Sequence, residues 1–200
     1  MGNSRFISCH YDEKYKINEN GGNRIVAKKK LNLTKKNILV SVHVLAVCAW
    51  FGGTLSLIIL GFYLKNAQNS DQLIYTLSSM QIIDENLLKY PALATLVTGI
   101  LLSVWTQWGL AKHYWVVIKL VLTVLIILIG IFLINDWFVY LVKTAEGLGA
   151  SALNQNKFES TWLSIIITGI FNLTCLAFMT FITYFKPFGK IKKNKKVATQ

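Results

Sequence analysis

The sequence predicts an all-α integral membrane protein, a bundle of four transmembrane helices. Of its 200 residues, 54% are hydrophobic and 15% are charged, whereas a soluble globular domain carries about 25% charged residues. The apolar residues also gather in four runs, each close to or above the ~20 residues that an α-helix needs to cross a bilayer. The four predicted spans are about residues 38–64, 90–108, 114–134 and 161–184.

The excess of basic residues lies outside these runs. The chain has 21 Lys and Arg against 9 Asp and Glu, with nine of the basic residues in the first 36 positions and six in the last 15. Membrane topology and anionic lipid head groups select basic flanks beside apolar spans. We therefore expect the lipid bilayer, with anionic head groups at both basic tails, as the partner, and no nucleic acid. A homo-oligomer is an open alternative.

Two polar tails flank the four-helix transmembrane domain, which we place at residues 37–186. Residues 1–36 are predicted to form a disordered, basic cytoplasmic tail, and residues 187–200 a second basic cytoplasmic tail. Pro187 and Gly189 are expected to stop the last helix between the two. The three cysteines are scattered and form no CxxC pair, so a disulfide framework is not expected.

The segments between the spans carry weaker patterns. Residues 65–89 begin as a loop and then show helical spacing, which predicts a short amphipathic helix at the membrane surface or one continuous with the second span. Its acidic end, Asp84 and Glu85, is interpreted as a solvated face, with a guarded entrance as the alternative. Pro91 suits the first turn of the second span. Residues 143–160 are expected to form a loop.

Small and polar residues inside the spans predict close helix contacts. Ala49, Gly52 and Gly53 allow a neighbouring helix to approach the first span. The turn at 109–113 is short, so the second and third spans should be antiparallel neighbours. Asn172 is the one strongly polar residue at mid-depth in the fourth span.

One ionisable side chain, His43, lies inside the first apolar run. Such a residue is costly to hold at membrane depth and indicates a functional site with a partner. Lys119, in the third run, is the candidate partner. His43 follows Lys36 by seven positions, and Lys119 follows His113 by six. At 1.5 Å per residue, both lie about 10 Å into the membrane from the cytoplasmic side.

Three interpretations of this pair remain open. In the first, Lys119 snorkels to the head groups and His43 hydrogen-bonds a backbone carbonyl. In the second, the neutral imidazole of His43 ligates haem iron or another metal, while Lys119 binds an anionic group such as a porphyrin propionate. In the third, the pair belongs to a proton or ion path. The cofactor is therefore unknown, with haem b as a candidate.

Short motifs accompany the pair and cover about residues 38–142. They are Trp50-Phe-Gly-Gly53, Tyr90-Pro-Ala, Thr98-Gly99 and Tyr114-Trp115-Val-Val-Ile-Lys119-Leu. With His43, they resemble a group of small bacterial integral membrane proteins. The group includes the CopD-type copper-resistance membrane domain, the HemJ-type protoporphyrinogen oxidases and function-unknown relatives of similar length, which are the nearest match. In the HemJ-type proteins a His in span one and a Lys in span three are implicated in haem binding and activity, and His43 and Lys119 look like those two.

The sequence also departs from both named types. HemJ-type proteins continue after the Gly-rich segment with a Pro-Arg and later a His, whereas residues 57–63 here are apolar. Copper handling favours clusters of Met, Cys and His, and Met80 and Met179 lie far apart in sequence. The resemblance implies a fold and a site with no catalytic residue assigned. The open functions are a tetrapyrrole- or metal-binding protein, an oxidoreductase acting on a porphyrin-like substrate, and a structural or assembly protein without a cofactor.

The charge distribution makes a prediction about topology in the cell membrane. Only four basic residues lie in the loops on the side opposite the tails, at Lys65, Lys89, Lys143 and Lys157. By the positive-inside rule both termini face the cytoplasm, and an even number of spans requires both on one side. A reporter fused after Gln200 should read as cytoplasmic, and the same reporter inserted after Gln68 should read as external. An external signal at Gln200 would contradict this topology.

Overall fold

The computed structural model describes residues 32–105 and 113–185. It confirms the all-α prediction, since these residues form helices joined by short connections. In chain order the elements are α1 (Leu33–Leu64), α2 (Ser70–Ile83), the π-helix η1 (Asp84–Lys89), α3 (Tyr90–Trp105), α4 (Tyr114–Ile129), the π-helix η2 (Gly130–Ile134), α5 (Asn135–Leu148), the 3₁₀-helix η3 (Gly149–Asn154) and α6 (Asn156–Phe185).

Several of these elements join end to end, so the described chain forms four long helical rods. α2, η1 and α3 are continuous, as are α4, η2 and α5. The rods are Leu33–Leu64, Ser70–Trp105, Tyr114–Asn154 and Asn156–Phe185, and each is long and apolar enough to cross a membrane. The chain is therefore a multi-pass membrane protein. Thirty residues of helix measure about 45 Å against about 30 Å of hydrocarbon, so every rod extends beyond the bilayer core.

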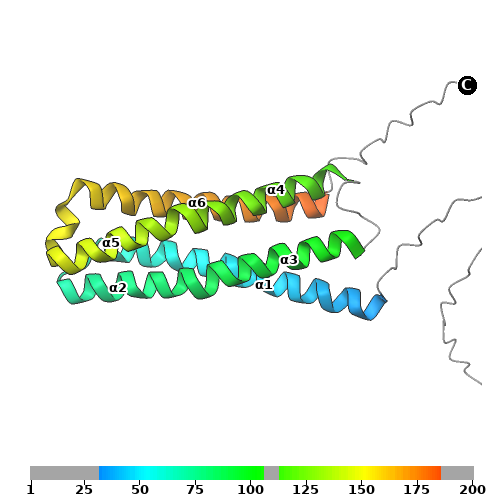
Figure 1. The fold of residues 1–200 in the computed structure, drawn as a ribbon, viewed down its shortest axis with the longest axis horizontal. Helices are drawn as coiled ribbons and strands as arrows, with labels where there is room; N and C mark the ends of the chain where they lie inside the picture. Colours follow the sequence, from blue (N-terminus) through cyan, green and yellow to red (C-terminus); the bar gives the residue numbers. More distant parts are fainter. Residues whose placement is uncertain (1–31, 106–112, 186–200) are drawn as a thin grey trace, which may run out of the picture.

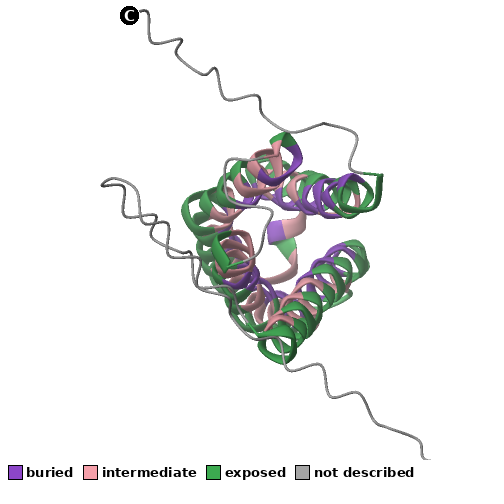
Figure 2. Cartoon of the chain, turned by 90° about the vertical axis from the view of Figure 1, so that its right-hand side faces the viewer, coloured by how far each residue is buried: buried purple, intermediate pink, exposed green. Residues whose placement is uncertain are grey.

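The four rods pack as an antiparallel bundle in which α1 and α4 stand diagonally opposite each other. α1 packs against α3 and α6, and α4 packs against the same two helices. At the far end of the bundle, α2 lies against α1 and α5 (Figure 1). The first residue of α1 and the last of α6 lie at the other end. Buried faces turn toward the centre and exposed faces outward (Figure 2).

The segment before the second span does not lie at the membrane surface as its amphipathic pattern suggested. Leu73, Leu77 and Met80 of α2 are fully buried and belong to the core that α1, α5 and α6 share. Two neighbouring helices bury this apolar face more completely than a lipid surface would, so α2 continues along the bundle axis. The alternative expectation, a helix continuous with the second span, is confirmed.

The predicted loop at 143–160 is wrong, because most of it is helical. α5 runs to Leu148, η3 follows, and α6 already begins at Asn156. The chain reverses at Gly149, whose φ of 58° is a conformation that residues with a Cβ rarely adopt. The hydroxyl of Ser70 accepts a hydrogen bond from the backbone N–H of Ala150 at 3.1 Å, which ties this turn to the start of α2.

α1 and α6 approach closely because each presents a glycine to an isoleucine of the other. A Cβ added at Gly61 would lie 2.3 Å from Cδ1 of Ile166, and one added at Gly169 would lie 3.0 Å from Cγ1 of Ile58. The indole N–H of Trp162 donates to the carbonyl oxygen of Gly61 at 2.7 Å. This reciprocal packing brings the C-terminal half of α1 close to the N-terminal half of α6.

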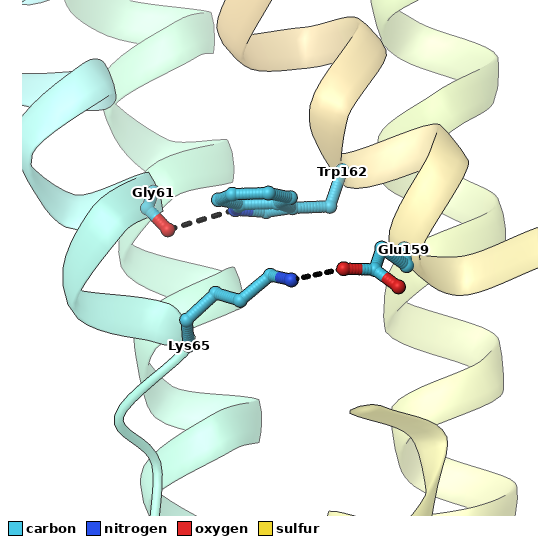
Figure 3. A network of polar contacts seen from close by, with 4 residues as sticks. All are labelled: Gly61, Lys65, Glu159 and Trp162. Carbon is cyan, nitrogen blue, oxygen red and sulfur yellow. Dashed lines mark hydrogen bonds and ion pairs between the residues drawn. The ribbon is translucent and has the colours of Figure 1, made fainter. Parts of the chain in front are cut away.

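A charged pair covers the same contact. Lys65, just after α1, forms an ion pair with Glu159 of α6, and its ammonium lies 4.5 Å from the ring centre of Trp162. Figure 3 shows the indole directed at the Gly61 carbonyl, with the Lys65–Glu159 pair alongside the ring. Because both charged side chains are exposed, the pair itself adds little stability. The buried packing at Gly61 and Trp162 stabilises the contact between α1 and α6.

Pro91 lies in the first turn of α3, as predicted, but α3 continues the preceding helix without a break. Proline has no N–H and its ring clashes with the carbonyl four residues earlier, here that of Leu87. The helix widens to the π-form of η1 just before it. Gly53 of α1 packs against this widened turn, where an added Cβ would lie 2.8 Å from both Cβ and the carbonyl oxygen of Leu87.

Some sequence predictions fall wholly or partly outside the described residues. These are most of the tail at 1–36, the end of the second span beyond Trp105, most of the turn at 109–113 and the tail at 187–200. Within the described part, α1 begins at Leu33, so its first turn overlaps the predicted tail. A helix that leaves the hydrocarbon continues as long as its backbone hydrogen bonds remain satisfied.

The two adjacent glycines of α1 offer a matched test of this packing. We expect Gly53→Ala to destabilise the bundle by about 1–3 kcal/mol, because the methyl group meets backbone atoms that cannot rotate away. At Gly52 nothing lies within 4 Å of an added Cβ, so Gly52→Ala should be neutral or slightly stabilising. Thermal unfolding in mild detergent measures both. Equal midpoints for the two variants would contradict the α1–η1 contact.

Candidate functional site

His43 is half-buried on α1 and faces α3. Its Nδ1 lies 2.8 Å from the hydroxyl oxygen of Thr98, and the imidazole also interacts with the backbone of Thr95. A Cβ added at Gly99 would lie 3.3 Å from Cε1 of the ring. Thr98 and Gly99, noted in the sequence, therefore form the contact surface for this imidazole. The Thr98 hydroxyl orients the ring, and Gly99 leaves room for it.

The hydrogen bonds around Thr98 determine which nitrogen of His43 carries the proton. The single hydroxyl proton of Thr98 is directed at the backbone carbonyl of Ala94, at 2.6 Å, with that of Thr95 further away at 3.2 Å. Since that proton is committed, the Thr98 oxygen acts as the acceptor and Nδ1–H of His43 as the donor. The neutral imidazole then carries its lone pair on Nε2.

Lys119 is half-buried on α4 and reaches toward α6. Its ammonium donates to the hydroxyl oxygen of Thr183 at 2.7 Å, and Thr183 donates its own proton to the carbonyl of Met179 at 2.7 Å. An ammonium has three protons, so two remain for other acceptors. Lys119 is thus held by a neighbouring helix.

The structure places the two predicted site residues on diagonal helices. His43 is anchored on α3 and Lys119 on α6. Along their helical faces, Trp50 and Thr54 on α1 and Thr123 on α4 are buried. The faces that carry His43 and Lys119 therefore turn inward, while the role of the pair stays a prediction.

A second polar location lies deeper in the bundle, where sequence reasoning did not predict a site. A cavity of about 430 Å³ lies among α1, η1, α3, α4, η2 and α6. Most of its lining is apolar, with Leu, Ile and Ala side chains from all these elements. Both π-helices contribute to its wall, and π-helical turns occur frequently at functional sites. Neither His43 nor Lys119 lines it.

Asp84 is the main correction among the polar residues. It was interpreted as part of a solvated face, but it is 3% exposed, lines the cavity and forms an ion pair with Lys89 at 3.1 Å. Residues five apart do not meet on an α-helix, and the wider π-turn of η1 brings these two onto one face. The available sequence signal was an acid and a base five positions apart, immediately before a proline.

Asn172, noted as the polar residue of the fourth span, also lines this cavity. It is 6% exposed, and its amide nitrogen donates to the hydroxyl oxygen of Thr54 at 2.9 Å. Its amide oxygen accepts no hydrogen bond from the described residues. A buried acceptor without a donor is costly, so this atom marks a position where a donor belongs.

The described residues hold no cluster of three or more His, Cys, Asp or Glu side chains suited to a metal ion. A metal near His43 would therefore have fewer than three ligands of these types from the described residues. That donor set does not suit a structural zinc site, which takes four, but does suit haem iron, which the porphyrin nitrogens already coordinate.

Comparisons with known proteins add no assignment. No protein-family model, curated protein or solved structure matches the chain. The resemblance to the CopD-type and HemJ-type proteins remains a prediction from short motifs.

The buried ion pair at the cavity can be tested through stability. Removing one partner of a buried pair costs roughly 3–5 kcal/mol because the other charge stays buried. The side chains of Lys89 and Asp84 are 29% and 4% exposed. Because Lys89 is partly exposed, Lys89→Met should lower the free energy of unfolding by about 3 kcal/mol, the lower end of this range.

The double variant Asp84→Asn/Lys89→Met should recover most of this loss, and Glu85→Gln, at the exposed neighbour, should be neutral. Chemical denaturation in detergent measures all three. A Lys89→Met protein as stable as the parent would contradict the buried pair.

Proposed function

We propose that this protein binds a haem-type metal porphyrin at the cytoplasmic end of its bundle, with His43 as the protein ligand to iron and Lys119 as the partner for a porphyrin carboxylate. The metal is bound by Nε2 of His43. Bound haem supplies a redox-active iron whose potential depends on this ligand and its surroundings. The proposal assigns binding, and it assigns no reaction.

The hydrogen bond between His43 and Thr98 is the observation that carries this proposal. Metal-binding histidines almost always donate their other ring N–H to an oxygen, which selects the tautomer and the ring orientation. Here Nδ1–H donates to the Thr98 hydroxyl at 2.8 Å, and the Thr98 proton is already directed at Ala94. The remaining Nε2 has the lone pair that a metal requires.

Lys119 supports the same proposal through its charge. Thr183 uses one proton of the ammonium and leaves two for a carboxylate. Haem carries two propionates, and a half-buried ammonium is a suitable partner for one of them. The pair is thus matched to one ligand that has both a metal and an anion.

The proposal includes the cell membrane as location, with both termini in the cytoplasm. The basic residues outside the described bundle support this orientation, because cytoplasmic flanks carry the excess of Lys and Arg. Six of them lie in the last 15 residues and nine in the first 36. Anionic head groups of the cytoplasmic leaflet are the expected partners of both segments.

A visible spectrum of the protein purified in mild detergent tests haem binding. We expect a Soret band in the parent protein and after reconstitution with haemin, and its loss or a large shift in His43→Ala. Thr98→Val should retain the band but weaken haem binding by about 10- to 100-fold, since it removes the group that orients the ligand.

Two variants serve as controls for the charge and for the other histidine of the bundle. Lys119→Met should weaken binding of haemin and leave that of a porphyrin esterified at both propionates unchanged, whereas His113→Ala should leave the Soret band intact. A colourless protein that folds normally and takes up no haemin would refute the proposal and leave a structural or assembly role.

A further inference from the structure

The cavity among α1, η1, α3, α4, η2 and α6 reaches the lipid-facing surface of the bundle. Leu93, Ile131 and Phe171 line it and are 44%, 47% and 46% exposed. Exposed apolar side chains on a membrane-spanning helix face hydrocarbon. A molecule dissolved in the bilayer therefore has access to the cavity without crossing the aqueous phase.

The orientation of the Asn172 amide is determined by a chain of three residues. The Thr54 hydroxyl donates its one proton to the backbone carbonyl of Trp50 at 2.9 Å. Its oxygen therefore acts as an acceptor toward Asn172, 2.9 Å away. If the amide were flipped, two acceptor oxygens would face each other, so the NH₂ group must point at Thr54.

The amide oxygen of Asn172 is consequently a buried acceptor in the cavity wall. No described residue donates to it, although the residue is 6% exposed and lines the cavity. Oδ1 can only accept, so its partner must carry an O–H or N–H group. This requirement specifies the polar part of a ligand.

The size and lining of the cavity specify the apolar part. An apolar cavity of about 150 Å³ holds one benzene ring, and this one measures about 430 Å³, which leaves room for two or three fused or linked rings. Its wall consists mainly of Ile, Leu, Ala, Trp and Phe side chains. Ligand pockets of this kind combine an apolar wall with a few polar groups that orient the ligand.

We propose that this cavity binds a membrane-soluble aromatic or alicyclic alcohol of two or three rings, whose hydroxyl donates to Oδ1 of Asn172 and whose ring system fills the apolar space. The ligand enters from the bilayer beside Leu93, Ile131 and Phe171. This site is separate from His43 and Lys119, which do not line the cavity, and it does not depend on the proposed haem binding.

Three matched probes test the chemistry on the unmodified protein. 4-Phenylphenol has two rings and one O–H, biphenyl lacks the oxygen, and 4-methoxybiphenyl has an oxygen without a proton. Isothermal titration calorimetry in detergent, with dissociation constants compared at equal concentration in the detergent phase, measures each. We expect 4-phenylphenol to bind about three- to tenfold more tightly than either analogue, because only it satisfies the buried acceptor.

Variants locate the site. Asn172→Leu should remove the preference for 4-phenylphenol over biphenyl. Gly130 lines the cavity, and a Cβ there meets nothing within 4 Å, so Gly130→Ile has room to fill the space and should weaken binding of both probes about tenfold or more. Gly147 is equally unobstructed and lies outside the cavity. Gly147→Ile should therefore leave binding unchanged.

The outcomes separate the alternatives. Saturable binding with the O–H preference, lost on filling the cavity, supports the proposal. Absence of saturable binding, equal affinity for the three probes, or unchanged affinity in Gly130→Ile would overturn it. If no probe binds saturably, the donor to Oδ1 of Asn172 is water alone. If Asn172→Leu fails to fold, the comparison of the three probes and that of Gly130→Ile with Gly147→Ile still test the proposal. Unchanged binding in His43→Ala would show that the two sites are independent.

Discussion

The close packing of α1 against its neighbours is the constraint on which the rest of the structure depends. Gly53 allows η1 to approach, and Gly61 and Gly169 allow α1 and α6 to interlock with isoleucines. Between lipid tails there is no hydrophobic force to drive helices together, so van der Waals contact at small residues holds a membrane bundle. The close contacts of α1 with α6 lie in the C-terminal half of α1, and Gly169 also lines the cavity.

Pro91 sets the geometry of the cavity wall through the backbone. Its missing N–H and bulky ring prevent a regular α-turn, and the helix widens into η1 just before it. The wider turn brings Asp84 and Lys89 together and turns Leu87 toward Gly53. One residue that lacks a donor thus produces both a buried ion pair and a close helix contact.

Threonines supply the polar connections of the bundle. Thr98, Thr183 and Thr54 each direct a hydroxyl proton to a carbonyl of their own helix, and each accepts from a side chain of another helix, His43, Lys119 or Asn172. A hydroxyl satisfied in this way offers only its oxygen. The threonines therefore determine how the side chains of His43, Lys119 and Asn172 are oriented.

Apolar run length and basic flanks were enough to predict the four-helix fold, and the rarity of ionisable residues in hydrocarbon was enough to single out His43 and Lys119. These signals are local, so the sequence by itself determined them. Only the tertiary structure decided that Asp84 is buried, that α2 extends the bundle, and that Asn172 meets Thr54 across 118 positions. Each depends on which helix faces which. That choice follows from glycine contacts and a widened turn at Pro91, and no periodic pattern in a single segment encodes it.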